Sequence, residues 1–299
     1  MRRLLFVPAG LILLLLFLFY GPMESFRLLW INTAMYTSRH KFLAEWFFTG
    51  KYINRVLAQN QPLEEYRTDD TALTNAWDDG IIFAEIRGNY FRGHIIKIND
   101  PRRLIFVRSD TEEGYDLDQF AEAHNALGGI NASGYADPDR RGIAWGIIID
   151  DGQVYSRLSR GGRHVMGGFT EEHKLVVGSF SEDEILMQQY TWALEFGPIL
   201  IVNGEKTEFP SYYGGFAPRT AIGQTAEGHV LLLTIEGRQR TSIGATFQDL
   251  QTILYANGAV NAINLDGGSS TSMVYQGNLI SSLSGRNTER LLPNAILFR

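Results

Sequence analysis

An apolar run at the amino terminus limits what the first part of this chain can become. Residues Leu4 to Tyr20 read LLFVPAGLILLLLFLFY, and two arginines, Arg2 and Arg3, precede them. A helix needs about 17–20 residues to cross the hydrocarbon core of a bilayer. No polar face interrupts the run, which disfavours a helix buried in the core of a soluble domain. The run therefore predicts a transmembrane helix.

The flanks of this run favour an uncleaved signal anchor, with a cleaved signal peptide as the alternative. Phe19 and Tyr20 stand where a cleavage site needs small residues. The two leading arginines favour a cytoplasmic amino terminus, although a second basic group after the run weakens this asymmetry. We expect a single-pass protein of the cell membrane, with residues 1–21 as cytoplasmic tip and anchor and the rest of the chain outside the cytoplasm.

Residues 22–69 predict a helical stalk between the anchor and a folded domain. Aromatic and aliphatic residues are interspersed with charged ones from Phe26 to Leu57, so amphipathic helices fit better than a second membrane pass. Such helices could lie on the bilayer or pack against the domain, and we favour packing. The candidates for their apolar side are Trp30, Tyr36, Phe42, Trp46 and Phe47.

Residues 70–299 have the pattern of one α+β domain, with a mixed, mainly antiparallel sheet and flanking helices. Helices are expected over 117–126, after the capping box that begins at Ser181, and from Thr246 to Tyr255. Turn residues such as Asp150-Asp151-Gly152 separate short apolar runs. These runs predict strands over 81–86, 94–98, 104–107, 145–149, 154–157, 198–202, 220–223, 230–235, 259–265 and 296–298.

The composition excludes several classes of function. A net charge of −6 without a basic stripe argues against nucleic-acid binding. The absence of cysteine excludes disulfides, zinc–thiolate sites, iron–sulfur clusters and cysteine nucleophiles. The 6 histidines lack metal-ligand spacing, and the sequence has no Walker loop, Rossmann glycine pattern or nucleophile elbow. We therefore expect neither a metal ion nor a cofactor.

A loop rich in glycine and hydroxyl groups carries the main catalytic candidate. It reads NLDGGSSTSM over residues 264–273, and Asp266 stands where the preceding strand ends. Adjacent glycines allow backbone conformations that other residues avoid, and the N–H and hydroxyl groups could surround an anion or a sugar. The alternative is a tight turn that Asp266 caps. The candidates in this loop are Asn264, Asp266, Gly267, Gly268, Ser269, Ser270 and Thr271.

Three further segments carry candidate side chains, each with a structural alternative. Arg219 could grip a phosphate with its planar guanidinium, or pair with a surface carboxylate. Asn131 could bond a sugar hydroxyl or satisfy loop backbone. Glu289 and Arg290 belong to a charged cluster before the last strand, which could be a solvated loop or a wall of the site.

Together, and in this order, six segments of the sequence resemble the phosphodiester glycosidase family. No single segment is specific, but the combination is. Ser269 departs from the family, which often has a third glycine there, and Leu291-Leu292 replace smaller residues after Glu289-Arg290. The stalk phrase WINTAM, residues 30–35, also looks like that of bacterial membrane-anchored members. The matching segments are 129–135, 196–198, 218–223, 232–238, 264–268 and 293–295.

The resemblance implies hydrolysis of the bond between the anomeric carbon of a sugar and a phosphodiester oxygen, of the N-acetylglucosamine-1-phosphodiester type. It implies Asp266 as the catalytic carboxylate, a cationic clamp of Arg219 and Arg290, and Glu289 as the acid if one is needed. Asn131 and Asn264 would orient the sugar, while the serine and threonine loop would hold phosphate oxygens. No cofactor is implied.

The implied substrate is a phosphate-linked glycan of the cell envelope or of an exopolysaccharide. Two alternatives belong to other classes. One is a non-catalytic, membrane-tethered glycan-binding protein that assists exopolysaccharide assembly, and the other is a phosphodiesterase that cuts the P–O bond.

Overall fold

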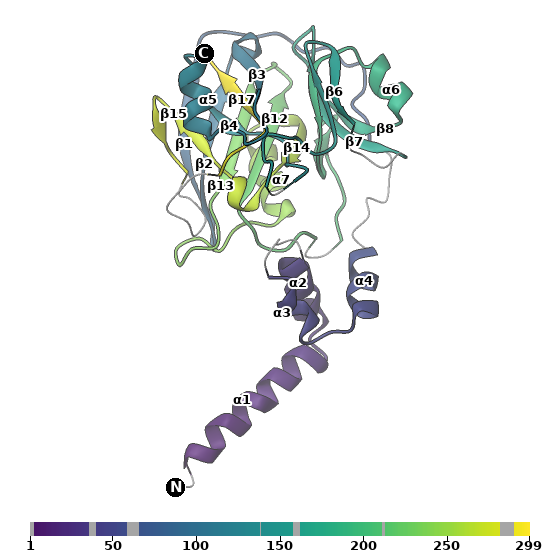
Figure 1. The fold of residues 1–299 in the computed structure, drawn as a ribbon, viewed down its shortest axis with the longest axis vertical. Coiled ribbons are helices and arrows are strands. Elements are labelled where there is room, and N and C mark those ends of the chain that lie inside the picture. The colour runs from purple at the N-terminus through teal and green to yellow at the C-terminus, as the bar shows by residue number, and fades with distance from the viewer. Residues whose placement is uncertain are drawn as a thin grey trace. The chain divides into compact units, whose positions relative to one another are not determined.

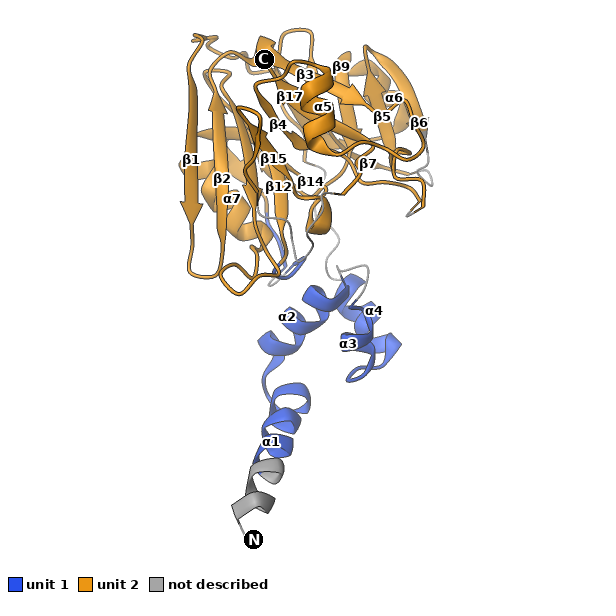
Figure 2. Cartoon of the chain, turned by 60° about the vertical axis from the view of Figure 1, so that its left-hand side comes forward, with its two compact units in different colours: residues 1–63, 208–216 blue, residues 64–207, 217–299 orange. Residues whose placement is uncertain are grey.

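The computed structural model describes residues 3–35, 40–58, 66–137, 139–157, 162–210, 213–281 and 290–299, without side chains for residues 3–9. Two candidate residues of the sequence analysis, Tyr36 and Glu289, lie outside these ranges. The chain divides into two compact units, residues 1–63 with 208–216 and residues 64–207 with 217–299 (Figure 2). Each unit is described by itself.

The first unit is helical, as the pattern of residues 22–69 predicts. It contains α1 (Arg3–Tyr20), α2 (Glu24–Met35), α3 (Phe42–Glu45) and α4 (Gly50–Ala58). Phe19 stacks on Phe47 with ring centroids 3.8 Å apart and meets the edge of Trp30 at 5.1 Å. In the described part of the chain no single helix passes a length and hydropathy test for a membrane span. Residues Gly10–Tyr20 and Glu24–Met35 pass it only together, as a pair bent by 84°.

The second unit contains three antiparallel sheets, which confirms the α+β class (Figure 1). The seven-stranded sheet has the order β1-β2-β13-β12-β14-β10-β11, one five-stranded sheet has the order β16-β15-β4-β17-β3, and the other has the order β6-β5-β9-β7-β8. The strands are β1 (Ile81–Arg87), β2 (Arg92–Ile98), β3 (Leu104–Arg108), β4 (Gly128–Asn131), β5 (Ile147–Asp150), β6 (Gln153–Arg157), β7 (His164–Thr170), β8 (Leu175–Phe180), β9 (Tyr190–Glu195), β10 (Ile199–Val202), β11 (Glu205–Lys206), β12 (Arg219–Thr225), β13 (Val230–Ile235), β14 (Ala259–Leu265), β15 (Met273–Tyr275), β16 (Asn278–Leu279) and β17 (Asn294–Phe298).

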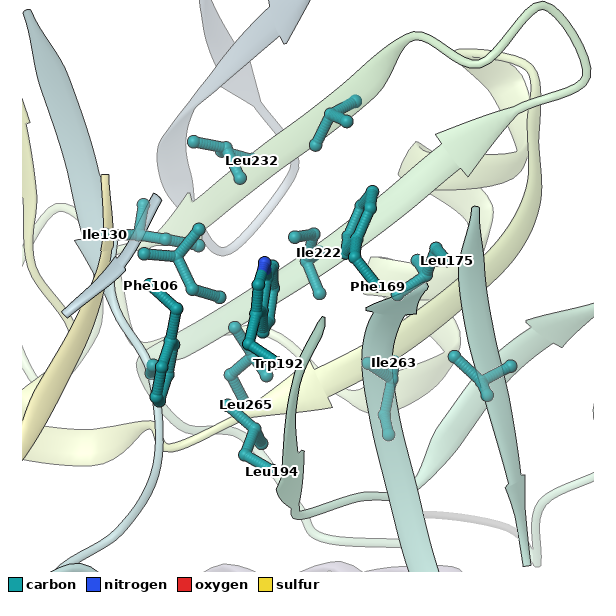
Figure 3. Packing of buried hydrophobic residues seen from close by; sticks show 14 of the residues in the cluster. Phe106, Ile130, Phe169, Leu175, Trp192, Leu194, Ile222, Leu232, Ile263 and Leu265 are labelled. Carbon is teal, nitrogen blue, oxygen red and sulfur yellow. The ribbon is translucent and has the colours of Figure 1, made fainter. Parts of the chain in front are cut away.

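One hydrophobic core joins the three sheets (Figure 3). Trp192 of β9 lies between the rings of Phe106 and Phe169, with centroid distances of 5.3 Å and 5.0 Å. Ile130 of β4 and Ile263 of β14 belong to the same buried cluster. Burial of apolar surface from three sheets in one place fixes how their strand ends converge, and the site below lies where two of these strands end.

Short helices border the sheets, and their caps confirm the local predictions. α5 (Leu117–Ala123), α6 (Glu182–Met187) and α7 (Phe247–Ala256) all begin with a capping box, and those of α6 and α7 start at Ser181 and Thr246. Asp151 and Gly152 have positive φ in the hairpin turn between β5 and β6. The helix expected over 117–126 is shorter, because Asn125 leaves the helix with a φ of 49°.

Gly128 and Gly129, which follow the helix predicted over 117–126, lie in β4. A Cβ on Gly128 would stand 2.5 Å from the carbonyl oxygen of Val274, and one on Gly129 would stand 2.5 Å from that of Ile296. The glycines therefore let the flanking strands β15 and β17 approach closely.

Candidate active site

Asp266 lies directly after β14, at a point where the seven-stranded sheet meets β4 of a five-stranded sheet. Its backbone N–H donates to the carbonyl oxygen of Ala132 at 3.0 Å, and its own carbonyl accepts from Nδ2 of Asn131 at 2.7 Å. Asn131 is the last residue of β4, and Ala132 follows it directly. The backbone of the candidate carboxylate is thus fixed from two sheets.

Asn131 uses its amide inside the protein. The residue is 0% exposed, and besides bonding Asp266 its Oδ1 accepts from Oγ1 of Thr220 at 2.8 Å and from the N–H of Ser272 at 3.1 Å. Buried polar groups need such partners, because an unsatisfied one loses its hydration without compensation. These contacts match the structural alternative for Asn131 and make it a positioning residue for Asp266.

The Asp266 carboxyl group has an unusual proton affinity. Burial raises its pKa from 3.8 to about 6, against smaller opposing effects. A hydrogen bond from Ser270, the positive charge of Arg290, the N–H of Gly267 and the charge of Arg238 each lower the pKa of Asp266. A carboxylate shielded from water and flanked by two cations is a common arrangement in active sites.

Two arginines accompany the carboxyl group. The guanidinium of Arg290 bonds the hydroxyl groups of Ser269 and Tyr135, and it lies 4.5 Å from the centroid of the Tyr135 ring. The guanidinium of Arg238 lies beside Gly268, where a Cβ would be 3.3 Å from Nη2. Partial burial and the nearby Arg290 lower the pKa of Arg238, while Asp266 raises it. The pair forms a cationic side of the site.

Arg219 is placed differently. It is 6% exposed, and its Nε donates to the carbonyl oxygen of Ala245 at 3.2 Å. Its guanidinium lies 3.9 Å from the centroid of the Phe247 ring, at the start of α7. These contacts tie β12 to the segment before α7.

Several backbone N–H groups of the loop after Asp266 are bonded within the protein. Gly268 has a φ of 64°, and its N–H donates to the carbonyl oxygen of Pro218 at 2.9 Å. The N–H groups of Ser270 and Ser272 also have partners within the protein, at 3.2 Å and 3.1 Å. The expected ring of N–H groups around a ligand is therefore engaged internally at these three positions.

Two buried acceptors near Asp266 have no partner in the described part of the chain. They are Oδ1 of Asn264, which is 2% exposed, and Oγ1 of Thr271, which is 5% exposed. Nδ2 of Asn264 donates to the carbonyl oxygen of Gly197 at 2.7 Å, so the orientation of this amide is fixed. Such acceptors are suited to a bound water or a substrate hydroxyl.

Aromatic side chains border the site at Gly134. A Cβ there would stand 3.3 Å from the Phe196 ring and 4.0 Å from both Cγ of Asp266 and Cβ of Trp145. Trp145 is 43% exposed, and its backbone N–H donates to the carbonyl oxygen of Gly134 at 2.8 Å. An exposed indole close to a carboxyl group offers an apolar surface to a ligand.

The sequence patterns indicated no role for Arg238, Tyr135 or Trp145. A signal for Arg238 was available, because the segment 232–238 that resembles the family ends at this residue. Tyr135 and Trp145 approach the site through long-range pairing that no local pattern reveals. Among the described residues, no group of three or more His, Asp and Glu side chains could hold a metal ion.

The chain has a counterpart among known protein families. The model of the phosphodiester glycosidase family matches residues 124–299, which is more than half of the chain. The chain therefore belongs to the phosphodiester glycosidase family.

Individual relatives are similar over shorter stretches. N-acetylglucosamine-1-phosphodiester alpha-N-acetylglucosaminidase of Mus musculus is 28% identical over 158 residues, which is 47% of this chain and 30% of the relative. The human protein of that name is 29% identical over 153 residues, or 45% of this chain and 29% of the relative. An uncharacterized prophage-derived protein of Bacillus subtilis is 37% identical over 194 residues, or 62% of this chain and 29% of the relative. The matched region thus spans less than a third of these relatives.

Solved structures share the fold. The zebrafish N-acetylglucosamine-1-phosphodiester alpha-N-acetylglucosaminidase catalytic domain, auto-inhibited by its pro-peptide, matches with a TM-score of 0.61 and 22% identity. The match covers 79% of this chain and 87% of that one. A hypothetical protein from Synechocystis matches with a TM-score of 0.54 and 17% identity, over 75% of this chain and 63% of that one. At these identities the likeness establishes the fold alone.

Proposed function

We propose that this protein hydrolyses the bond between the anomeric carbon of a sugar and a phosphodiester oxygen. One observation carries the proposal: Asp266 has a pKa raised to about 6 and lies in the electrostatic field of Arg290 and Arg238. A carboxylate and a pair of guanidinium groups match the two charges that separate when such a bond breaks. Membership of the phosphodiester glycosidase family supports the same reaction.

The carboxylate of Asp266 faces the sugar in this mechanism. As the bond breaks, the sugar takes on oxocarbenium character, and a carboxylate close to the anomeric carbon stabilises that positive charge or activates the attacking water. With a pKa of about 6, Asp266 is mostly ionised at neutral pH. Its partial burial strengthens the interaction, because little water screens the two charges.

Arg290 and Arg238 bind the phosphate in this mechanism. The leaving group is a phosphate monoester with a second pKa of about 6, so it departs without full protonation. Two guanidinium groups can stabilise its negative charge in place of a strong general acid. We assign to Arg238 the role in the cationic clamp that the sequence suggested for Arg219, and we propose that Arg219 braces the segment before α7.

The remaining candidates position or contact the substrate. We propose that Oδ1 of Asn264 and Oγ1 of Thr271 accept hydrogen bonds from the sugar or from a bound water, since both lack a partner among the described residues. Asn131 and the loop of Gly267, Gly268 and Ser270 hold the Asp266 backbone and carboxyl group in place. Ser269 orients Arg290.

We also propose that the substrate is a phosphate-linked glycan of the cell envelope and that the chain acts from the outer face of the membrane. The apolar run from Leu4 to Tyr20 and the bent helix pair support a membrane anchor. A tethered enzyme outside the cytoplasm would meet polymers attached to the envelope.

The test uses the full chain in detergent, incubated with UDP-N-acetylglucosamine as an N-acetylglucosamine-1-phosphodiester. Wild type is expected to release free sugar, and Asp266→Asn is expected to lose at least about 10²-fold in rate, the scale of a lost charge-stabilising contact. Asp118→Asn is the matched control, because burial also raises the pKa of Asp118, on α5.

Labelled water then identifies the bond that breaks. Cleavage at the anomeric carbon places the heavy oxygen in the sugar. Label in the phosphate would replace the proposal with P–O cleavage, and a folded wild type that binds the substrate without turnover would favour a glycan-binding protein. Full activity of Asp266→Asn would refute the assigned mechanism.

A further inference from the structure

A cavity of about 350 Å³ has a lining that includes neither Asp266 nor the loop after it. Its walls come from β3 and β17 on one side, from β5 and β6 on the other, and from residues 142–144. The volume falls in the range of about 300–1,000 Å³ that is usual for small-molecule sites. The lining residues that matter below are Arg108, Ser109, Ala144, Tyr155, Ser156 and Asn294.

The charged groups at this cavity neutralise each other. Nε of Arg108 donates to Oδ2 of Asp150 at 2.8 Å, and the side chains are 32% and 26% exposed. The Arg108 guanidinium also lies 3.5 Å from the centroid of the Tyr155 ring. Because the arginine is engaged by both a carboxylate and an aromatic face, the cavity offers little net charge to an anion.

The uncharged groups at the cavity, an aromatic ring and hydroxyl groups, are of the kinds that commonly contact carbohydrate. Tyr155 is 49% exposed, so part of its ring remains accessible beside Arg108. The C–H face of a sugar ring is weakly apolar and packs against the electron-rich face of an aromatic ring. Hydroxyl groups of Ser109 and Ser156 line the same space and can exchange hydrogen bonds with sugar hydroxyls.

The cavity shares a wall with the candidate active site. Ala144 forms an isolated β-bridge with Tyr135, whose hydroxyl bonds Arg290. On the other side, Oδ1 of Asn294 accepts from the N–H of Ser133 at 2.8 Å, and its Nδ2 donates to the Ser133 hydroxyl at 2.8 Å. Residues 133–135 thus contact both residues that line the cavity and a residue of the candidate active site.

We propose that this cavity binds a neutral sugar unit of the phosphate-linked glycan. The inference rests on the proposed function for the identity of the glycan, and on the cavity itself for the chemistry of the ligand. Tyr155 supplies the stacking surface, and the Arg108–Asp150 pair supplies polar contacts to ring hydroxyls.

The test measures binding of N,N′-diacetylchitobiose, a neutral disaccharide, by titration calorimetry to the full chain in detergent. Asp266→Asn serves as the background, so that no turnover can occur. Adding Tyr155→Ala is expected to weaken binding about tenfold, the scale of a lost aromatic contact. Tyr255→Ala is the matched control, because Tyr255 is also 49% exposed and also carries a cation, Lys206, 4.7 Å from its ring centroid.

Each other outcome overturns the proposal. Equal affinity in all three proteins, an equal loss in the Tyr255→Ala control, or no binding at millimolar disaccharide would exclude a neutral-sugar subsite at Tyr155. Binding of inorganic phosphate that depends on Arg108 and displaces the sugar would make the cavity an anion site. Sugar release is measured separately. A chain without hydrolase activity that still binds the disaccharide through Tyr155 would refute the proposed function and retain the subsite.

Discussion

Nδ2 of Asn131 donates a hydrogen bond of 2.7 Å to the carbonyl oxygen of Asp266, a residue 135 positions later in the chain. The bond joins the end of β4, in a five-stranded sheet, to the end of β14, in the seven-stranded sheet. The position of the candidate carboxylate is therefore set by the packing of two sheets, and the shared core with Ile130 and Ile263 holds those sheets together.

Asn131→Ala is expected to destabilise the protein by about 3 kcal/mol, because three hydrogen bonds of about 1 kcal/mol each are lost inside the protein. Urea unfolding of the full chain measures the change. Asn278→Ala is the control, since Asn278 is exposed and its Nδ2 donates to the nearby carbonyl of Gln276. A loss no larger than that of the control would mean that the Asn131 network contributes little.

Arg290→Gln and Arg238→Gln are each expected to lower kcat/KM by about 10²–10³-fold, since each removes a cation from the developing phosphate charge. The corresponding lysine variants should recover only part of the rate, because an ammonium cannot reproduce the planar fork. Sugar release from UDP-N-acetylglucosamine is the readout. Arg102→Gln, at an arginine paired with Asp100, should leave the rate unchanged. Wild-type rates in both glutamine variants would remove the clamp from the mechanism.

Arg219→Met should behave in the opposite way to Arg290→Gln. It leaves the buried carbonyl oxygen of Ala245 with one hydrogen bond fewer and removes the cation above Phe247, so we expect a loss of about 2 kcal/mol in unfolding free energy. Arg290→Gln should instead lower the rate of sugar release by about 10²–10³-fold. If Arg219→Met unfolds like wild type yet loses activity, Arg219 belongs to the clamp after all.

Local signals in the sequence predicted much of this fold. The caps of α6 and α7 at Ser181 and Thr246 follow from short-range chemistry, because in each a side chain bonds a backbone group three residues away. The strand over 259–265 was predicted from its apolar run. The strands β7, β8 and β9 were not predicted. The glycines of β7, Gly167 and Gly168, weaken the strand pattern, but they let Ile263 and Ala193 pack against the backbone.

The site was predictable only where a motif marks the end of a strand. Asp266 could be singled out because a carboxyl group follows an apolar strand and precedes two glycines. The burial that raises its pKa could not be, because it depends on how the sheets pack, and Arg238, whose charge lowers that pKa, comes from another part of the chain. For the same reason the sequence left two roles open for Arg219 and Asn131, a ligand contact and a structural one, because a residue type alone does not show which atoms its side chain meets.

The rate of sugar release should fall as the pH drops below about 6. The mechanism needs the ionised form of Asp266, and a group with a pKa of about 6 is mostly protonated one unit below that value. We expect kcat/KM to decline about tenfold per pH unit in the acid limb. The residual rate of Asp266→Asn should lack this limb. A rate that instead rises as the pH falls through 6 would make Asp266 a general acid.

The same carboxyl group should weaken the fold at neutral pH. Its pKa is 3.8 when unfolded and about 6 when folded, so the folded state binds the proton more tightly. Stability is therefore unaffected below the unfolded pKa, falls as the pH rises from about 4 to 6, and stays reduced above 6. A difference of about two pKa units corresponds to about 2–3 kcal/mol.

Asp266→Asn removes this ionisable group while keeping its shape, so at pH 7 the variant should be more stable than wild type by up to about 2–3 kcal/mol, and at pH 4 the gain should disappear. Urea unfolding at both pH values measures it. Asp78→Asn provides a control of opposite sign, because hydrogen bonds from Asn99 and Gly80 lower the pKa of Asp78 and its removal should destabilise the fold at neutral pH. A gain in stability for Asp266→Asn that persists at pH 4 would come from packing and not from ionisation. A loss of stability at pH 7 would mean that the two arginines stabilise the carboxylate more than burial destabilises it.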